Sequence, residues 1–416
     1  MNNQELIIKN QEWIGRIPSD WSLVKIKEHF VERNIKVDDV SFQPLSVSMG
    51  GIVDQMENVS KSDDSGNRKL VKKNDFVINS RSDRKGSSGI SPRDGSVSLI
   101  NIVLKPKNIN PKYSEYLLKS YYFKEEFFRN GKGIHFDLWS TRYQLMKQIL
   151  IPYPNIDEQT QIVDYLDKKT KKIDELVTKI GKKVELLKEQ KTSLINEVVT
   201  KGINPNVEMK DSGVEWIGEI PNDWDFMKLK RLFYINKRIS GELGHDVLSV
   251  TQKGLKVKDL ENNEGQHSMD YSKYQLVFKD DFVMNHMDLL TGYVDLSKQP
   301  GVTSPDYRVF TKSGEKVHNQ YYLFLFQLCY TQRIFYGLGR GVSNMGRWRL
   351  PSVEFLNMFL PLPSYPEQQQ IVDCLDEQTQ LIDKKITTEE KRIELLKEYR
   401  QSLVSEVVTG KKRVVH

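Results

Sequence analysis

The side chains of this sequence that could act on a ligand are hydrogen-bond donors gathered in glycine-containing loops. Two such loops lie in the first half, NSRSDRKGSSG from residue 79 and GKGIHFDLWSTR from residue 131, and a third, GRGVSNMGRWR, starts at residue 339. Arginine, lysine and amide side chains held on a scaffold read base edges of nucleic acids, and looser positive charge contacts phosphates. The candidates are Asn79, Arg81, Arg84, Lys85, Lys132, His135, Trp139, Arg142, Asn285, His286, Arg340, Asn344, Arg347 and Arg349.

The alternative is that these loops are merely solvated, as most charged loops are. Their composition favours the first interpretation, because each loop around Trp139 or Trp348 combines glycine, arginine and an aromatic residue. Stacking aromatics beside arginine are typical of nucleic-acid contacts.

No motif for catalysis accompanies these donors. The sequence has no GxxxxGK[ST] phosphate loop, and its nearest approach to the NPPY of amino-methyltransferases is NPKY at residues 110–113. The glycine-rich segment at 337–341 follows no clean strand-to-helix transition. Cys329 and Cys374 stand far apart without histidine or cysteine at ligand spacing. We therefore expect no catalytic residue and no metal site.

The charge is distributed unevenly. The net charge is +6, and residues 1–157 carry 24 basic and 19 acidic side chains, whereas residues 203–366 carry 19 of each. DNA binding by the second half would therefore depend on local clustering. No apolar run approaches the ~20 residues of a membrane span, and the first residues lack a signal-peptide pattern. These features predict a soluble, cytoplasmic protein.

An internal repeat defines the elements that must position the loops. EWIGRIPSDW at residues 12–21 recurs as EWIGEIPNDW at 215–224, and EQTQIVDYLD at 158–167 recurs as EQQQIVDCLD at 367–376. The near-constant offset indicates that one whole unit was duplicated. Between these segments each unit has short β-rich runs and then a helical pattern, which predicts a mixed α/β domain. The Trp-containing openings are expected to be core and packing residues.

Each unit ends in a long helix with an apolar stripe. Heptad spacing places Leu166, Ile173, Ile180, Leu187 and Leu194 on one stripe, and the repeat places Leu375, Ile382, Leu396 and Leu403 on the other. About 40 residues make a helix of roughly 60 Å. A lone helix cannot bury such a stripe, so the two helices are predicted to pair, antiparallel because each leaves a different domain.

The predicted domains are residues 1–157 and 203–366, with spacer helices at 158–202 and 367–416. The fold class is α+β: two similar mixed domains separated by a pair of long antiparallel coiled-coil helices, with a pseudo-twofold repeat. Asp157 is the expected N-cap of the first helix. Pro366 holds the equivalent position in the second, where Ser364 is a poorer-placed substitute.

These features resemble the DNA-specificity (S) subunit of Type I restriction-modification systems. The resemblance rests on the openings IGRIPSDW and IGEIPNDW, the junctions IPYPNIDEQTQI and LPLPSYPEQQQI, and the duplicated heptad helix, and it covers nearly the whole chain. The first unit departs from it where the second has SPDY at residues 304–307.

The resemblance implies a non-catalytic reader of double-stranded DNA. Each domain would read one half of a bipartite target, and the helices would set the gap and dock two methyltransferase subunits. Restriction/translocase subunits would join through the complex, and S-adenosylmethionine, ATP and Mg would be bound by partners, with no cofactor in this chain and no membrane partner. Two alternatives are a restriction or methylation enzyme with fused reader domains, and a structural coiled-coil adaptor.

Overall fold

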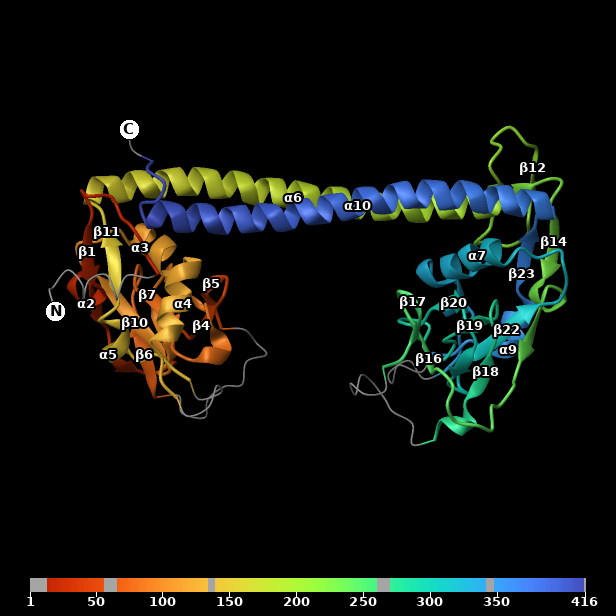
Figure 1. Ribbon diagram of the computed structural model, residues 1–416, viewed down its shortest axis with the longest axis horizontal. Helices are drawn as coiled ribbons and strands as arrows, with labels where there is room; N and C mark the ends of the chain where they lie inside the picture. The colour runs from red at the N-terminus through yellow and green to blue at the C-terminus, as the bar shows by residue number, and fades with distance from the viewer. Residues whose placement is uncertain (1–12, 56–65, 134–138, 260–269, 342–347, 415–416) are drawn as a thin grey trace. The chain divides into compact units, whose positions relative to one another are not determined.

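The computed structural model describes residues 13–55, 66–133, 139–259, 270–341 and 348–414. The chain divides into two compact units, one made of residues 1–181 and 390–416 and the other of residues 182–389. Each unit contains one mixed domain and parts of both long helices, α6 (Ile156–Lys201) and α10 (Tyr365–Val408) (Figure 1). Within the described ranges, no helix is long and apolar enough to cross a membrane.

The first unit is built on a four-stranded antiparallel sheet in the order β2-β10-β7-β8, beside a three-stranded sheet β3-β6-β9 and two-stranded sheets β4-β5 and β1-β11. The elements are β1 (Ser22–Lys25), α2 (Ile26–His29), β2 (Phe30–Glu32), β3 (Lys36–Val37), β4 (Leu45–Ser48), β5 (Gly51–Asp54), β6 (Arg68–Val71), β7 (Phe76–Asn79), η1 (Ser82–Arg84), β8 (Ser88–Ile90), β9 (Gly95–Ser98), β10 (Asn101–Pro106), α3 (Pro111–Leu118), α4 (Tyr121–Arg129), α5 (Tyr143–Met146) and β11 (Leu150–Tyr153).

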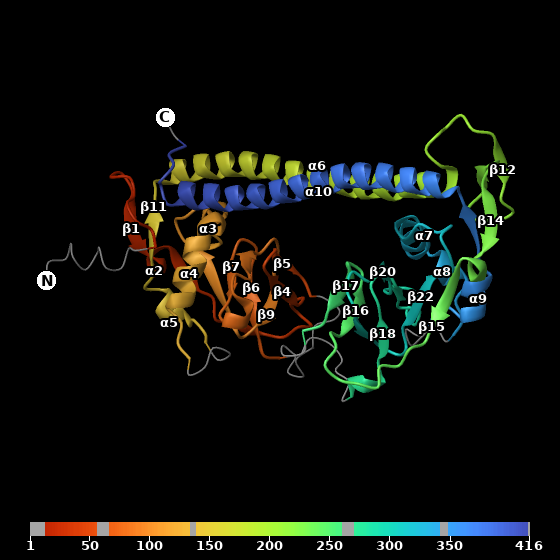
Figure 2. The same ribbon diagram turned by 45° about the vertical axis from the view of Figure 1, so that its right-hand side comes forward.

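The second unit repeats this plan, with a four-stranded sheet in the order β15-β22-β19-β20 and the pairs β16-β17, β18-β21, β14-β23 and β12-β13. Its elements are β12 (Met209–Asp211), β13 (Glu219–Pro221), β14 (Asp225–Lys228), η3 (Leu229–Arg231), β15 (Phe233–Asn236), β16 (Leu248–Thr251), β17 (Gly254–Val257), η4 (Tyr271–Lys273), β18 (Gln275–Val277), β19 (Phe282–Met284), β20 (Val294–Leu296), β21 (Gly301–Thr303), β22 (Arg308–Lys312), α7 (Asn319–Thr331), α8 (Ile334–Gly337), α9 (Ser352–Asn357) and β23 (Phe359–Leu362) (Figure 2).

Both central sheets are buried on two faces, which explains their nearly continuous apolar strands. Side chains alternate between the faces of a strand, so Phe76 and Ile78 of β7 pack with α3 and α4, while Val77 joins a separate cluster on the other face. In the second unit Phe282 packs with α7 and Val283 faces the opposite cluster. Phe76 and Val77 of β7 therefore correspond to Phe282 and Val283 of β19.

The opening of each unit pairs with its own junction. Strand β1 runs antiparallel to β11 with Ser22 opposite Tyr153, and β14 runs antiparallel to β23 with Asp225 opposite Leu362. The buried Trp21 donates its indole N–H to the Glu158 carboxylate at 3.0 Å. The expectation that the openings pack in the core is confirmed for the described residues. Pairing of opening with junction fixes where each mixed domain starts and ends.

The predicted caps of the long helices were wrong in detail. The Asn155 side chain accepts the Glu158 backbone N–H at 2.9 Å, so Asn155 caps α6, and Asp157 lies inside the first turn. Ser364 holds the same position before α10 and accepts the Glu367 N–H at 3.4 Å. A short polar side chain three residues before the capped N–H is the required geometry. Ser364 is therefore well placed, and Pro366 sits within the first turn.

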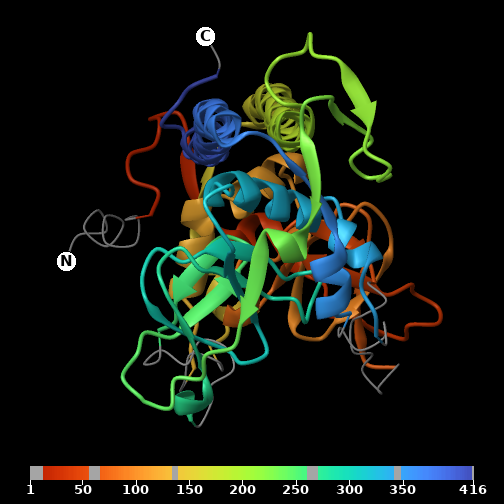
Figure 3. The same cartoon turned by 90° about the vertical axis from the view of Figure 1, so that its right-hand side faces the viewer.

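The long helices pack antiparallel within each unit, as predicted, and Figures 1 and 3 show them side by side. In the first unit Arg400 of α10 binds Asp174 of α6 at 2.9 Å, and in the second Lys191 of α6 binds Asp383 of α10 at 2.7 Å. The predicted seam residues Leu166, Ile173, Ile180, Leu375, Ile382 and Leu403 are buried, and Leu187, Leu194 and Leu396 are half-buried.

One buried charge interrupts the seam. Glu389 stands where the repeat has Ile180, and its carboxylate accepts from the Lys183 ammonium group at 2.6 Å. An unpaired charge at that depth would be costly. The ion pair thus makes the one mismatch of the seam compatible with burial.

Candidate nucleic-acid interface

The structure joins the two candidate loops of the first unit into one surface. The loop after β7 and the loop after α4 are linked by backbone hydrogen bonds, from Ser82 N–H to the Trp139 carbonyl at 3.0 Å and from Thr141 N–H to the Ser80 carbonyl at 2.9 Å. Arg81 and Ser140 form an antiparallel bridge. Residues about 60 positions apart in sequence therefore lie together on this surface.

The second unit has the same arrangement. Leu289 N–H donates to the Trp348 carbonyl at 3.2 Å, and Leu350 N–H donates to the His286 carbonyl at 3.0 Å. The bridge between Arg340 and Arg349 matches the bridge between Lys132 and Ser140. The two units thus hold equivalent loop pairs that carry different side chains.

The two tryptophans anchor these loops. The indole N–H of Trp139 donates to the Phe128 carbonyl at 2.9 Å, and that of Trp348 donates to the Tyr336 carbonyl at 2.7 Å. A Cβ atom at Gly131 would overlap the Trp139 indole, just as one at Gly339 would overlap that of Trp348. These glycines are therefore required by close packing. Trp139, predicted as a DNA contact, has its only donor engaged within the chain.

Asn79 and Asn285 also shape the loops. The side-chain oxygen of Asn79 accepts the Arg81 N–H at 3.0 Å, and that of Asn285 accepts the Met287 N–H at 3.2 Å. Each asparagine forms an Asx-turn at the end of a central strand, Asn79 as the last residue of β7 and Asn285 just after β19. Asn79 is buried whereas Asn285 is half-buried. The Asn79 turn sets the backbone of Arg81, and the Asn285 turn sets the backbone of Met287.

The cations of the first unit border a hollow of about 500 Å³ on the loop surface. Arg81 and Arg84 are exposed along its wall together with Lys85, and Arg84 lies 3.8 Å from Asp83. Lys85 binds Glu125 at 2.7 Å and lies over the Phe128 ring at 4.5 Å. Lys132 and Arg142 are exposed on the neighbouring loop. Arg81 and Arg84 are the cations here best placed to meet a ligand.

In the second unit Arg349 is exposed, while Arg340 pairs with Glu354 at 2.5 Å. His286 lies beneath them. Burial first, and then the charges of Arg308 and Arg349, lower the pKa of His286 to about 3. A predicted donor is therefore a neutral imidazole at ordinary pH. His135, Asn344 and Arg347, also predicted as contacts, lie outside the described residues.

Two arginines at these sites were missed from the sequence. Arg308 is buried beneath the second loop pair, donates to the Leu350 carbonyl at 2.8 Å and stacks on the Phe355 ring at 4.6 Å. Arg68 lines the hollow of the first unit and donates to Ser96 Oγ at 2.8 Å. Both are single arginines within β-strands, and no spacing signal marks them.

The His286 environment predicts acid sensitivity of the second unit. An unfolded chain protonates histidine below pH about 6.5, whereas folded His286 stays neutral to about 3. The unfolded state binds more protons between these values, so this contribution to stability is present above pH 6.5 and declines as pH falls. Replacing His286 with asparagine is expected to reduce the loss of unfolding free energy between pH 7 and pH 5, measured by urea denaturation. Equal losses in both proteins would contradict it.

The comparisons with known proteins fit this architecture. A family model described as the Type I restriction modification DNA specificity domain matches residues 18–186 and again 221–398. The Type I restriction enzyme MjaVIII specificity subunit of Methanocaldococcus jannaschii is 24% identical, over 96% of this chain and 94% of the relative. The putative type I restriction enzyme MjaX specificity subunit of the same organism is 23% identical, over 96% of each chain.

Two solved structures share the fold. A chain from a study of complex assembly and conformational transition of the type I R-M system superposes with a TM-score of 0.70 at 14% identity, covering 95% of this chain and 100% of the other. The HsdS subunit from Thermoanaerobacter tengcongensis gives a TM-score of 0.53 at 13% identity, covering 95% and 98%.

Proposed function

Because the chain belongs to the Type I restriction modification DNA specificity domain family, we propose that it is the sequence-specific DNA-binding subunit of a Type I restriction-modification complex. It carries no catalytic step itself. Each unit reads one half of a bipartite target, and the long helices set the gap between the halves.

One observation carries this proposal. Each of the two matched segments contains one complete loop pair, in which two donor-bearing loops are hydrogen-bonded to each other. The two loop pairs have equivalent backbone hydrogen bonds but different side chains. The first carries Arg81 and Arg84 and the second carries Arg349, which suits two half-sites of different sequence. Bidentate contacts by such arginines distinguish guanine from other bases.

The family also implies partners. The chain works with DNA and with methyltransferase partners, and we propose two methyltransferase subunits docked on the repeated helices, with restriction/translocase subunits joining through them. S-adenosylmethionine, and ATP with Mg, would be bound by those partners and not by this chain. Since such a complex acts on chromosomal DNA, we place it in the cytoplasm.

Neither alternative is favoured. A fused restriction or methylation enzyme is not favoured, because the relatives that match over 96% of this chain are named specificity subunits. A coiled-coil adaptor would have no use for two equivalent loop pairs.

The proposal is tested by mapping methylation. The chain is expressed with its methyltransferase partner in a bacterial host without other modification, and methylated adenines are located by single-molecule sequencing. We expect a two-part motif with a fixed gap, present only when both proteins are made. Methylation of an undivided motif, or an unchanged pattern when this chain is omitted, would refute the proposal.

A point substitution tests the second loop pair. Arg349 is exposed and forms the bridge with Arg340, so Arg349→Ala is expected to weaken target binding by the assembled methyltransferase at least tenfold, about 1.4 kcal/mol. Comparison with a duplex scrambled in one half-site, at two salt concentrations, separates the two possible roles. If Arg349 contacts a base, the variant discriminates less between the two duplexes. If Arg349 contacts a phosphate, the variant binds both duplexes more weakly to the same extent, and the salt slope falls by about one.

Arg231→Ala is the matched control for this substitution. Arg231 is an exposed arginine of η3 and takes no part in the backbone hydrogen bonds that join the loop pair. Unchanged affinity in Arg349→Ala would show that Arg349 takes no part in DNA binding.

A further inference from the structure

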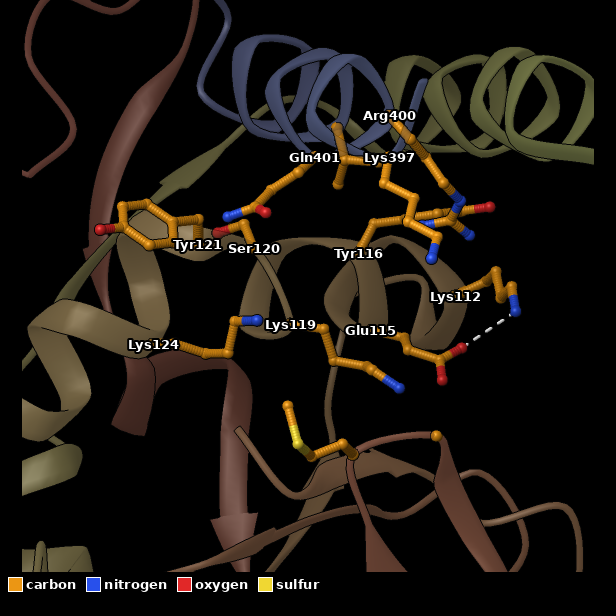
Figure 4. Close-up of a pocket in the computed structure, with 13 residues that line it drawn as sticks. Lys112, Glu115, Tyr116, Lys119, Ser120, Tyr121, Lys124, Lys397, Arg400 and Gln401 are labelled. Atoms are coloured by element: carbon orange, nitrogen blue, oxygen red, sulfur yellow. Dashed lines mark hydrogen bonds and ion pairs between the residues drawn. The ribbon is translucent and has the colours of Figure 1, made fainter. Parts of the chain in front are cut away.

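A second basic hollow lies in the first unit, between α3, the start of α4 and α10. Its volume is about 530 Å³. Figure 4 shows Lys397 and Arg400 reaching toward it from α10, with Lys112 and Lys119 on the side of α3 and Lys124 on α4. One acidic side chain, Glu115, lines it with these five cations. None of these residues belongs to the loop pair described above.

Only part of this positive charge is neutralised. Lys112 binds Glu115 at 2.9 Å, and Arg400 binds Asp174 at 2.9 Å. Among the described residues, Lys119, Lys124 and Lys397 have no carboxylate within ion-pair distance. Burial lowers the pKa of both Lys119 and Lys124, and neighbouring cations lower each further. Half-buried ammonium groups held near one another favour an anion from outside.

The equivalent place in the second unit lacks this character. A hollow there is lined by Glu185, Lys188 and Glu189, with polar residues Thr192, Ser193, Asn196 and Gln332. Lys188 is the repeat equivalent of Lys397 and binds Glu185 at 3.3 Å. A partner docking on both repeats would meet similar chemistry in each. The basic hollow is therefore unsuited to a subunit that binds the two repeats alike.

The hollow adjoins the first loop pair. The exposed Met49, in the turn of the β4–β5 hairpin, lines both this hollow and the one beside Arg81 and Arg84. A Cβ atom at Gly86 of the reading loop would lie 3.1 Å from Lys124 Cδ. Positive charge thus continues from the loop pair, past the hairpin, to α10.

From this continuity we propose that the hollow binds backbone phosphates of the DNA duplex, next to the half-site that the first unit reads. The inference rests on the proposed function and names a contact region that adds affinity without sequence preference. Lys119 and Lys124 supply the phosphate contacts, and Lys397 adds to the positive electrostatic potential of the hollow. A long, repeating anion is needed to fill both hollows at once, which favours duplex DNA over a small phosphorylated ligand.

The test replaces Lys119 and Lys124 together with glutamine and measures DNA binding by the chain assembled with its methyltransferase partner. Losing two phosphate contacts is expected to weaken binding about tenfold at 0.15 M salt, for the target and an unrelated duplex alike, and to reduce the salt slope by about two. The opposite change, Glu115→Gln, leaves more positive charge in the hollow and is expected to tighten both. Thermal unfolding shows that each variant folds.

The matched control is Lys171→Gln with Lys172→Gln, which removes the same charge from exposed positions of α6 in the same unit. Unchanged DNA binding in the Lys119 and Lys124 variant would overturn the proposal. If gel filtration showed that the variant no longer assembles with the methyltransferase, the hollow would be assigned to an acidic partner protein, and the proposal would equally be overturned. Inorganic phosphate or a nucleotide could instead bind the wild-type protein, but not the Lys119 and Lys124 variant, without weakening DNA binding. That result would assign the hollow to a small ligand and overturn the proposal. If wild-type protein bound no target at all, the proposed function itself would fail.

Discussion

Exchanging residues 26–149 for the corresponding segment of another family member is expected to replace one half of the recognised DNA sequence completely and leave the other half unchanged. Both loops of the first pair, at 79–89 and 131–142, lie inside this segment. The segment begins directly after β1 and ends directly before β11, and the pairing of Lys25 with Leu150 closes the domain. The exchange therefore carries every reading side chain of the first unit and keeps the packing of Trp21 with Glu158.

Methylated sites, mapped by sequencing, give the result directly. The reciprocal exchange of residues 229–358, bounded by β14 and β23 in the same way, should alter the opposite half. A change in both halves after either exchange would mean that reading is shared between the units.

Adding one heptad to each long helix is expected to lengthen the gap by about three base pairs and leave both half-sites unchanged. Seven residues add about 10.5 Å of helix at 1.5 Å per residue, and each base pair occupies about 3.4 Å of DNA. The insertions belong between Gly181 and Lys182 and between Glu389 and Glu390, where the compact units divide. The pairs Arg400 with Asp174 and Lys191 with Asp383 then keep their partners.

The control inserts the heptad in α6 alone. That insertion has no equivalent in α10, so the seam contacts and ion pairs of one unit must be lost. We therefore expect this variant to unfold at a lower temperature and to give no methylation. A double insertion that changed a half-site at constant gap would contradict the role of the helices as a spacer.

The helices could be predicted because their signal is periodic and repeated. Heptad spacing was enough to predict the seam residues and the pairing of the two helices. Only the structure shows that Leu187, Leu194 and Leu396 are half-buried and not fully buried. The cap at Asn155 was missed because Asn155 and Asp157 are both good capping types two residues apart. Position relative to the first helical turn decides between them, and the sequence does not specify it to that precision.

The reading surface could be predicted only as separate loops. Composition identified the loops around Arg81 and Trp139, but their hydrogen bonding to each other is a tertiary contact without a sequence signal. The same holds for Arg308, whose burial depends on its stacking on Phe355. The hollow beside Lys119 combines residues nearly 280 positions apart, such as Lys119 and Lys397, so no local window contains it.

The first unit combines residues 1–181 with residues 390–416, and this has a consequence for biosynthesis. The Tyr113 hydroxyl donates to the Val408 carbonyl at 3.3 Å, Arg413 binds Asp20 at 2.7 Å, and Val404, Val407 and Val408 belong to the core of the first unit. The domain that leaves the ribosome first therefore cannot complete its core until residues 404–408 have been synthesised. The second unit is one continuous segment, residues 182–389. A ribosome that stops shortly before residue 400 would release a chain whose later-made domain is intact and whose earlier-made domain exposes apolar surface to chaperones and proteases.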